Sequence, residues 1–119
     1  MADRVALSAF IITCNEADRL PATLEAVRQL ADDIVVVDSG STDDTVAVAE
    51  RLGARVLHND WPGFGPQKRF AEPQCRHDWL LNLDADEVLS DAAIAEIRTL
   101  FADGPPPRPG YYLKVVTIY

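Results

Sequence analysis

The sequence predicts an α/β protein in which helices cover both faces of a mainly parallel β-sheet, giving three layers, α/β/α. Two patterns indicate this class. Short apolar, β-branched runs alternate along the chain with segments of helical periodicity, and several of these runs end in polar or acidic residues. The length of 119 residues also suits a single domain around one core.

Five segments are predicted to be strands. The first three are apolar runs from Val5 to Thr13, from Asp33 to Asp38 and from Arg55 to His58. The fourth is the short run from Trp79 to Leu83, which has the length of a buried strand. The last runs from Tyr111 to Tyr119, after a proline-rich connector. Because the chain stops inside this apolar strand, we expect it to be the N-terminal part of a longer protein.

The first and third predicted helices contain prolines near their starts. Pro21 lies in the first turn of the first helix, where its missing N–H costs nothing. The apolar residues of this helix recur at helical spacing: Leu20, Leu24, Val27 and Leu30. A short third helix is predicted over residues 67–75, with Pro66 near its start.

The second and fourth predicted helices have recognisable ends. Ser41 and Asp44 resemble a capping box that opens the second helix, and Gly53 lies where a C-terminal glycine is expected. Ser90 is the predicted N-cap of the fourth helix, with Asp91 in its first turn. The inner stripe of this helix is Ile94, Ile97, Leu100 and Phe101.

Polar side chains collect where the predicted strands end. Parallel strands place their carboxyl ends at one edge of the sheet, where α/β proteins bind ligands. The residues expected there are Asn15, Glu16, Asp38, Ser39, Asp84 and Asp86. In an extended chain Asp84 and Asp86 would project side by side, and two such carboxylates attract a divalent cation. We therefore expect Asp38, Asp84 and Asp86 to gather around one cavity that can hold a cation, with ligand phosphates completing its shell; the alternative for Asp84 and Asp86 is a solvated turn after the strand.

The composition argues against some classes of binding partner and indicates the cellular compartment. A net charge of −8 and a pI near 4.5 argue against nucleic acid and anionic membranes. We expect neither a signal peptide nor a membrane span, because the N-terminus lacks a basic and apolar leader and no apolar run reaches about 18 residues. Cys14 and Cys75 are expected to be reduced rather than to form a disulfide, which suggests a cytoplasmic protein.

Four blocks of this sequence together resemble family 2 glycosyltransferases, which have the GT-A fold with a Rossmann-like nucleotide-binding half. The combination is most similar to the subgroup of lipopolysaccharide or lipooligosaccharide core glucosyltransferases. The blocks span nearly the whole chain: Ser8 to Glu16, Ile34 to Thr45, Trp61 to Arg69 and the Asp-x-Asp block Leu83 to Glu87.

The resemblance implies an inverting transfer of a sugar, glucose in this subgroup, from a UDP-sugar to a saccharide or glycolipid acceptor of the lipopolysaccharide core. It implies that Asp84 and Asp86 hold a divalent metal, Mn²⁺ or Mg²⁺. The residues that would contact the nucleotide sugar are Thr13, Asn15, Glu16, Asp38, Ser39, Lys68 and Asp84. The general base of the family lies beyond the metal motif, so it is expected after Tyr119. Peripheral contact with the inner face of the membrane stays open.

Several of these residues have two alternative roles. Asp38 could contact the uracil or ribose, cap the neighbouring loop, or do both, and Glu16 could serve only the start of the first helix. Lys68 or Arg69 could hold a phosphate or lie exposed on its helix.

The aromatic residues of the third block, Trp61 and Phe64, could line the donor pocket or anchor their loop on the core. Glu87 could orient metal-bound waters or lie in a solvated turn, and His58 and His77 are expected to be structural or exposed. Many family members have an aromatic residue where this chain has Cys14, so base stacking from that position is not expected.

Other functions fit the sequence less well. A non-catalytic fragment that binds nucleotide sugars is the nearest alternative. A receiver domain would need paired acids after the first strand, where this chain has Asn15 and Glu16; Lys114 is the one feature in its favour. After the first strand, a nucleotidyltransferase usually has a glycine-rich basic loop, and an NAD-dependent enzyme has a Gly-x-Gly-x-x-Gly motif. Neither pattern follows the first strand of this chain.

Overall fold

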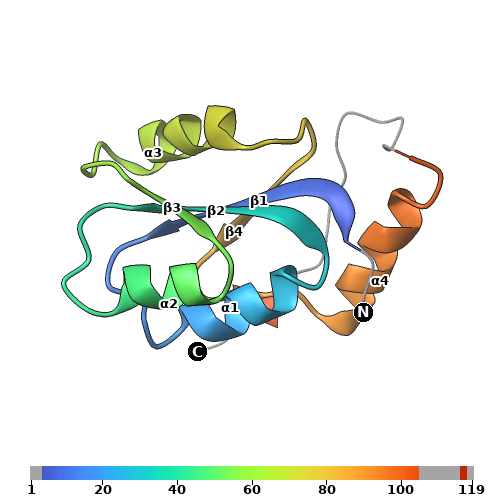
Figure 1. Ribbon diagram of the computed structural model, residues 1–119, viewed down its shortest axis with the longest axis horizontal. Helices are drawn as coiled ribbons and strands as arrows, with labels where there is room; N and C mark the ends of the chain where they lie inside the picture. Colours follow the sequence, from blue (N-terminus) through green and yellow to red (C-terminus); the bar gives the residue numbers. More distant parts are fainter. Residues whose placement is uncertain (1–3, 105–115, 118–119) are drawn as a thin grey trace.

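A computed structural model describes residues 4–104 and 116–117. Its centre is a four-stranded parallel sheet in the order β3-β2-β1-β4. The strands are β1 (Val5–Thr13), β2 (Ala31–Asp38), β3 (Arg55–His58) and β4 (Leu80–Asp84). Figure 1 shows α3 over one face of the sheet and α1 and α2 over the other, which gives the three layers expected from the sequence.

The helices follow the strands in alternation. Their bounds are α1 Leu20–Val27, α2 Thr45–Arg51, α3 Phe64–Ala71 with the 3₁₀ turn η1 Glu72–Gln74, and α4 Asp91–Leu100. Pro21 lies in the first turn of α1, and Gly53 follows the end of α2 with a φ of 94°, as expected. Ser90 caps α4, because its hydroxyl accepts a hydrogen bond from the Ala93 N–H at 3.0 Å.

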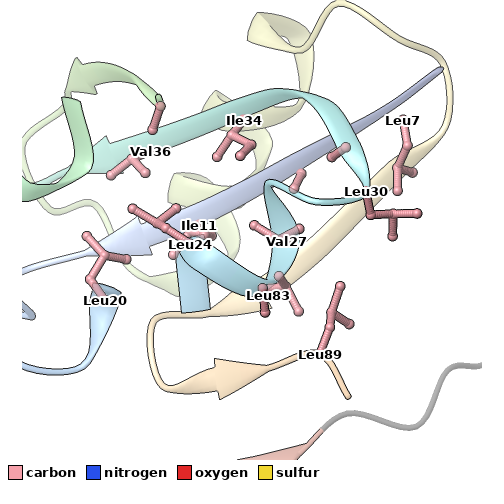
Figure 2. Close-up of a cluster of buried hydrophobic side chains, with 14 of the residues drawn as sticks. Leu7, Ile11, Leu20, Leu24, Val27, Leu30, Ile34, Val36, Leu83 and Leu89 are labelled. Carbon is pink, nitrogen blue, oxygen red and sulfur yellow. The ribbon is translucent and has the colours of Figure 1, made fainter. Parts of the chain in front are cut away.

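The alternation of side chains along β1 and β2 divides the core into two clusters. The larger cluster lies between the sheet and α1, and Figure 2 shows Leu24 and Val27 of α1 against Ile11, Val36 and Leu83 of the strands. Helix α4 packs its buried residues into the same cluster. The smaller cluster lies on the α3 face: Phe10, Val35, Val37 and Ala71. Each fully buried aliphatic side chain contributes about 1.5–3 kcal/mol, so burial on both faces holds the sheet rigid under its loops.

A buried carboxylate joins three strands near the amino end of the sheet. Asp33 is 4% exposed and accepts hydrogen bonds from Ser8 Oγ at 2.7 Å and from the Arg76 N–H at 2.9 Å. Arg55 binds the same carboxylate with two guanidinium nitrogens, at 3.0 and 3.1 Å. Burial alone would raise the pKa of Asp33, but these hydrogen bonds and the Arg55 charge lower it below its usual value.

The structure corrects several local expectations. Ser41 does not open α2 with a capping box, because its hydroxyl binds the Asp38 carboxylate instead and the N-cap is Asp44 without a side-chain bond. Helix α3 starts at Phe64 rather than residue 67, after Gly63 with a φ of 110°. Strand β2 begins at Ala31, and α1 ends at Val27, so Leu30 contributes to the core from beyond the helix.

A second, two-stranded sheet follows the fourth strand. Strand β5 (Glu87–Val88) pairs antiparallel with β6 (Val116–Thr117). Most of the strand predicted from Tyr111 to Tyr119, Lys114 included, lies outside the described residues.

The cysteines agree with a reduced state. Cys14 and Cys75 are both free thiols, as expected. Burial, together with the charge of Asp33, raises the pKa of Cys75 to about 11. In the part of the chain that the structure describes, none of the helices has the length and apolar character needed to span a membrane.

Candidate functional site

A cavity of about 660 Å³ lies at the carboxyl ends of the strands. Its lining comes from the ends of β1 and β4, the residue after β2, the loops after β1 and β3, the start of α3 and the turn after β4: Ile12, Thr13, Cys14, Glu16, Arg19, Ser39, Trp61, Phe64, Asp84, Ala85 and Asp86. The volume is within the range of about 300–1,000 Å³ that is usual for small-molecule sites.

The strand order explains why the cavity forms at this point. The chain adds β2 and β3 on one side of β1 and then crosses to add β4 on the other side. The loops after β1 and β3 lead to helices on opposite faces of the sheet, α1 and α3 (Figure 1), and open α/β sheets bind ligands in the crevice where the strand order reverses in this way. Ile12 and Asp84 are register partners at this crevice, and both line the cavity.

Asp84 and Asp86 share the cavity, but not by the extended geometry expected from the sequence. Strand β4 ends at Asp84, and residues 85–86 form a turn into β5. The Asp84 N–H donates to Glu87 Oε1 at 2.7 Å, and the buried Ala85 carbonyl accepts from Thr23 Oγ1 of α1 at 2.6 Å. The turn is therefore fixed to α1 while its two carboxylates face the cavity. Glu87 closes this turn and is not among the lining residues.

The cavity carries three carboxylates and one guanidinium. Glu16 and Arg19 come from the segment between β1 and α1 and lie opposite the acidic turn. Arg19 Nη1 is 3.8 Å from Asp86 Oδ2, with the two side chains 62% and 27% exposed. The local charge is therefore negative, which favours a cation or a ligand that brings one.

The loop after β1 and the loop after β2 bind each other through Asn15. Asn15 has a φ of 54°, and its N–H donates to Ser41 Oγ at 2.7 Å. Its side-chain oxygen accepts from the backbone N–H groups of Thr42 at 2.8 Å and Asp43 at 3.3 Å. The Glu16 N–H donates to Thr45 Oγ1 at 2.8 Å. These bonds fix the backbone next to the cavity, and Asn15 itself does not line it.

Asp38 lies beneath the cavity wall rather than on it. It is 2% exposed and accepts hydrogen bonds from Thr13 Oγ1 at 2.8 Å, the Ser41 N–H at 2.8 Å and the Gly40 N–H at 3.0 Å. Burial disfavours its charged form, but these bonds and that from the Ser41 hydroxyl outweigh it, so the pKa of Asp38 is below its usual value. Asp38 therefore caps the neighbouring loop, which is one of the roles expected from the sequence. It does not line the cavity together with Asp84 and Asp86, although this was also expected.

An aromatic pair forms the outer wall. Trp61 and Phe64 pack edge to face, with ring centroids 4.9 Å apart. They are 49% and 74% exposed, so the alternative in which they anchor their loop on the core is wrong. Gln67, fully buried behind them, accepts from Asn59 Nδ2 at 2.7 Å and holds the β3–α3 loop. The lining of the cavity therefore includes both aromatic side chains and carboxylates.

The residues predicted to bind the sugar nucleotide or the metal divide into those that line the cavity and those that do not. Five line the cavity: Thr13, Glu16, Ser39, Asp84 and Asp86. Asn15 and Asp38 support its loops, and Lys68 and Arg69 lie on α3 outside the lining. Sequence reasoning missed Arg19. Its position in the segment after the carboxyl end of the first strand was the available signal.

The carboxylates in the cavity suit a hard divalent ion as ligands. Among the described residues no group of three or more His, Cys, Asp or Glu side chains forms a ready-made metal cage. Two carboxylates in one cavity nevertheless match Mg²⁺ or Mn²⁺, which commonly binds to one or two protein carboxylates and completes its shell with waters and ligand phosphates. The residues present therefore fit a metal that arrives with a phosphorylated ligand.

The two histidines each contact an aspartate side chain outside the lining. His58 Nε2 is 2.7 Å from Asp60, and His77 contacts Asp32. Both placements agree with the structural or exposed roles expected from the sequence.

Comparison with known proteins shows one family over most of the chain. The model of Glycosyl transferase family 2 matches residues 8–107. An uncharacterized glycosyltransferase of Rickettsia felis is 47% identical over 114 residues, which cover 95% of this chain and 40% of the relative. The lipopolysaccharide core biosynthesis glycosyltransferase LpsC of Rhizobium meliloti is 41% identical over 102 residues, or 82% of this chain and 37% of the relative. The chain thus spans about 40% of the length of these two relatives.

Solved structures show a similar fold. Glucosyl-3-phosphoglycerate synthase from Mycobacterium tuberculosis, in complex with Mn²⁺, UDP and glucosyl-3-phosphoglycerate, aligns with a TM-score of 0.68 at 23% identity, over 84% of this chain and 40% of that one. S. aureus TarS, residues 1–349, aligns with the same TM-score at 20% identity, over 82% of this chain and 32% of that one.

Proposed function

The chain belongs to glycosyl transferase family 2 and has the GT-A fold, and on that basis we propose that it is the donor-binding part of a metal-dependent glycosyltransferase. The observation that carries this proposal is the single cavity in which the strand-end residues Thr13 and Ser39 meet Asp84 and Asp86. The whole protein transfers a sugar from a UDP-sugar to an acceptor hydroxyl.

The chemistry of the cavity walls suggests how a nucleotide sugar lies in it. Ser39, which is half-buried beside Thr13, offers a hydroxyl that can bind a base or ribose, whereas the Thr13 hydroxyl already donates to Asp38. The faces of Trp61 and Phe64 suit a planar base or the apolar face of a sugar. The diphosphate then lies toward Asp84 and Asp86, which repel it unless a cation intervenes. Asn15 and Asp38 act by shaping the two loops, and Lys68, on α3 outside the lining, is a second candidate for a phosphate contact.

Asp84 and Asp86 are the residues that would hold Mn²⁺ or Mg²⁺. Such an ion supplies Lewis-acid stabilisation of the negative charge that grows on the departing diphosphate. The chain's own contribution is a turn whose backbone is fixed by Thr23 and Glu87, so that both carboxylates are oriented before a ligand arrives.

The proposed reaction is a single displacement with inversion. An acceptor oxygen forms a bond to the anomeric carbon of the sugar while the bond from that carbon to the diphosphate oxygen breaks. UDP leaves with the bonding electrons, and a general base takes the hydroxyl proton. We assign no base among the residues of this chain and propose that it lies beyond Tyr119. The chain alone therefore binds the donor but transfers sugar poorly.

The similar proteins support a choice of donor and acceptor. The mycobacterial synthase was crystallised with UDP-glucose and Mn²⁺, and LpsC is named for lipopolysaccharide core biosynthesis. We propose UDP-glucose as the donor and a lipopolysaccharide-core glycolipid or saccharide as the acceptor. The two free cysteines support a reducing compartment, so we place the protein in the cytoplasm, with contact at the inner membrane face where a lipid-linked acceptor is presented.

Isothermal titration calorimetry with UDP tests the binding half of the proposal. We expect UDP to bind in the presence of Mn²⁺ and to lose about tenfold or more in affinity when EDTA is added or when Asp86→Asn is introduced. Asp103→Asn, an exposed carboxylate after α4, is the matched control and should bind like the wild type. Absence of heat at millimolar UDP with Mn²⁺ would reject donor binding.

A radiolabel assay tests the catalytic half. UDP-[¹⁴C]glucose is incubated with a lipopolysaccharide-core acceptor and either this chain or the full-length protein. We expect label transfer from the full-length protein alone. Robust turnover by residues 1–119 would show that the base lies within them and would overturn that part of the proposal.

A further inference from the structure

Arg19 is placed to exchange partners inside the cavity. Among the described residues that line it, Arg19 is the one basic side chain, facing the carboxylates of Glu16, Asp84 and Asp86. Its contact with Asp86, at 3.8 Å, is longer than a hydrogen bond, and the guanidinium is 62% exposed. Exposed ion pairs of this kind are worth only about 0.2–1 kcal/mol, so the pair separates easily when a better partner arrives.

The backbone around Arg19 is held independently of its side chain. Arg19 is the N-cap residue of α1 without a side-chain capping bond, and its N–H donates to the Glu16 carbonyl at 3.1 Å. One turn further along α1, Thr23 binds the Ala85 carbonyl of the acidic turn. The start of α1 and the turn that carries Asp86 are therefore fixed to one another, while the Arg19 guanidinium is free to reorient between them.

The charges predict what happens when metal and nucleotide bind. A divalent ion on Asp84 and Asp86 competes with Arg19 for the Asp86 carboxylate. A nucleoside diphosphate brings phosphate oxygens to the same place, and guanidinium groups bind phosphate through paired, charge-assisted hydrogen bonds. Lys68 and Arg69, the two basic residues that the sequence offered as candidate phosphate contacts, lie outside the cavity lining.

On the basis of the proposed function, we propose that Arg19 is the diphosphate-binding residue of this chain. Without ligand it neutralises Asp86, and when a metal takes Asp86 it transfers to the donor's phosphate oxygens. Arg19 thereby discriminates in favour of nucleoside diphosphates and against nucleotides with fewer phosphates. No covalent step is involved.

The test measures metal and nucleotide binding separately on Arg19→Gln. Titration with Mn²⁺ alone should show about two- to fivefold tighter binding than the wild type, because the competing ion pair is gone. Titration with UDP at saturating Mn²⁺ should show about tenfold or more weaker binding, because a charge-assisted contact is lost. UMP should lose less than UDP. Arg19→Lys should recover part of the UDP affinity, and Arg51→Gln, an exposed arginine at the end of α2, is the matched control for net charge.

Each result has a separate meaning. Opposite changes for Mn²⁺ alone and for UDP with Mn²⁺, in a variant with an unchanged melting temperature, support the proposal. Unchanged UDP affinity in Arg19→Gln, or equal losses for UMP and UDP, overturns the role of Arg19 while leaving donor binding intact. If wild-type protein fails to bind UDP with Mn²⁺, the proposed function fails and this inference fails with it.

Discussion

Thr13 and Asp38 meet across the ends of β1 and β2, where the Thr13 hydroxyl donates to the Asp38 carboxylate at 2.8 Å. Thr13 lines the cavity, and Asp38 lies directly beneath it, bound also to the loop that begins at Ser39. Through this contact one buried carboxylate organises both the wall of the cavity and the loop beside it.

Removing this carboxylate should cost considerable stability. Asp38→Ala leaves several hydrogen-bond donors without a partner, so we expect a loss of about 2–4 kcal/mol in the free energy of unfolding. Thr13→Val, which removes one bond, should cost about 1 kcal/mol. Urea denaturation measures both. Asp44→Asn is the control from the same loop, because the Asp44 side chain makes no capping bond. A loss of less than about 0.5 kcal/mol for Asp38→Ala would contradict the role given to Asp38.

Acid should weaken the fold through Asp33 and Asp38. The pKa of each carboxyl is lower in the folded protein than its usual value. Such a group contributes stability that is fully present above its unfolded pKa, about 3.9, and is lost as the pH falls through the folded pKa. We therefore expect the free energy of unfolding to drop as the pH falls below about 4. Denaturation at several pH values should show a flatter curve for Asp38→Asn, and an equally steep curve would argue against this assignment.

The conformation of Asn15 can be separated from its hydrogen bonds. Asn15→Gly and Asn15→Ala both lose the bonds to Thr42 and Asp43, but only glycine adopts a φ of 54° without strain. We expect Asn15→Ala to be about 1 kcal/mol less stable than Asn15→Gly. Both should also bind UDP with Mn²⁺ more weakly than the wild type. Equal stability of the two variants, measured by thermal denaturation, would mean that the left-handed backbone is not retained in solution.

Tryptophan fluorescence can report on the aromatic wall. The chain has two tryptophans; Trp61 lines the cavity, whereas Trp79 packs against Phe101 beside the core. In Trp79→Phe the remaining signal comes from Trp61, and we expect it to be quenched or shifted by UDP-glucose with Mn²⁺. In Trp61→Phe the signal comes from Trp79 and should not respond. A response confined to Trp79 would place the ligand elsewhere.

The sequence predicted elements whose signals are local. The apolar run of β1, the helix stop at Gly53 and the N-cap at Ser90 each depend on a residue and its near neighbours, and all were confirmed. The same was true of the convergence of strand ends at one edge, since a parallel sheet dictates it. The Ser41 capping box failed because Asp38 offers the Ser41 hydroxyl a charged acceptor, which competes with the helix N–H groups.

Contacts between distant segments could not be predicted. The turn at Ala85 and Asp86 is fixed by Thr23, 62 positions earlier, and no periodicity in the chain encodes that bond. The position of Arg19 opposite Asp86 likewise depends on the strand order, which puts the loop after β1 next to the end of β4. Lys68 was a candidate phosphate contact because it lies in a recognisable block, but in the structure it lies on α3 outside the lining.

The location of a bound Mn²⁺ tests the central claim most directly. Mn²⁺ is paramagnetic and broadens the NMR signals of nearby amides, while Mg²⁺ in the same position does not. With UDP present, we expect Mn²⁺ to broaden the amides of Thr13, Glu16 and residues 84–87, and Mg²⁺ to leave them sharp. Amides near Asp33, toward the amino end of the sheet, should stay sharp with either ion. Broadening centred on Asp33, or none at residues 84–87, would contradict a metal and nucleotide site in this cavity.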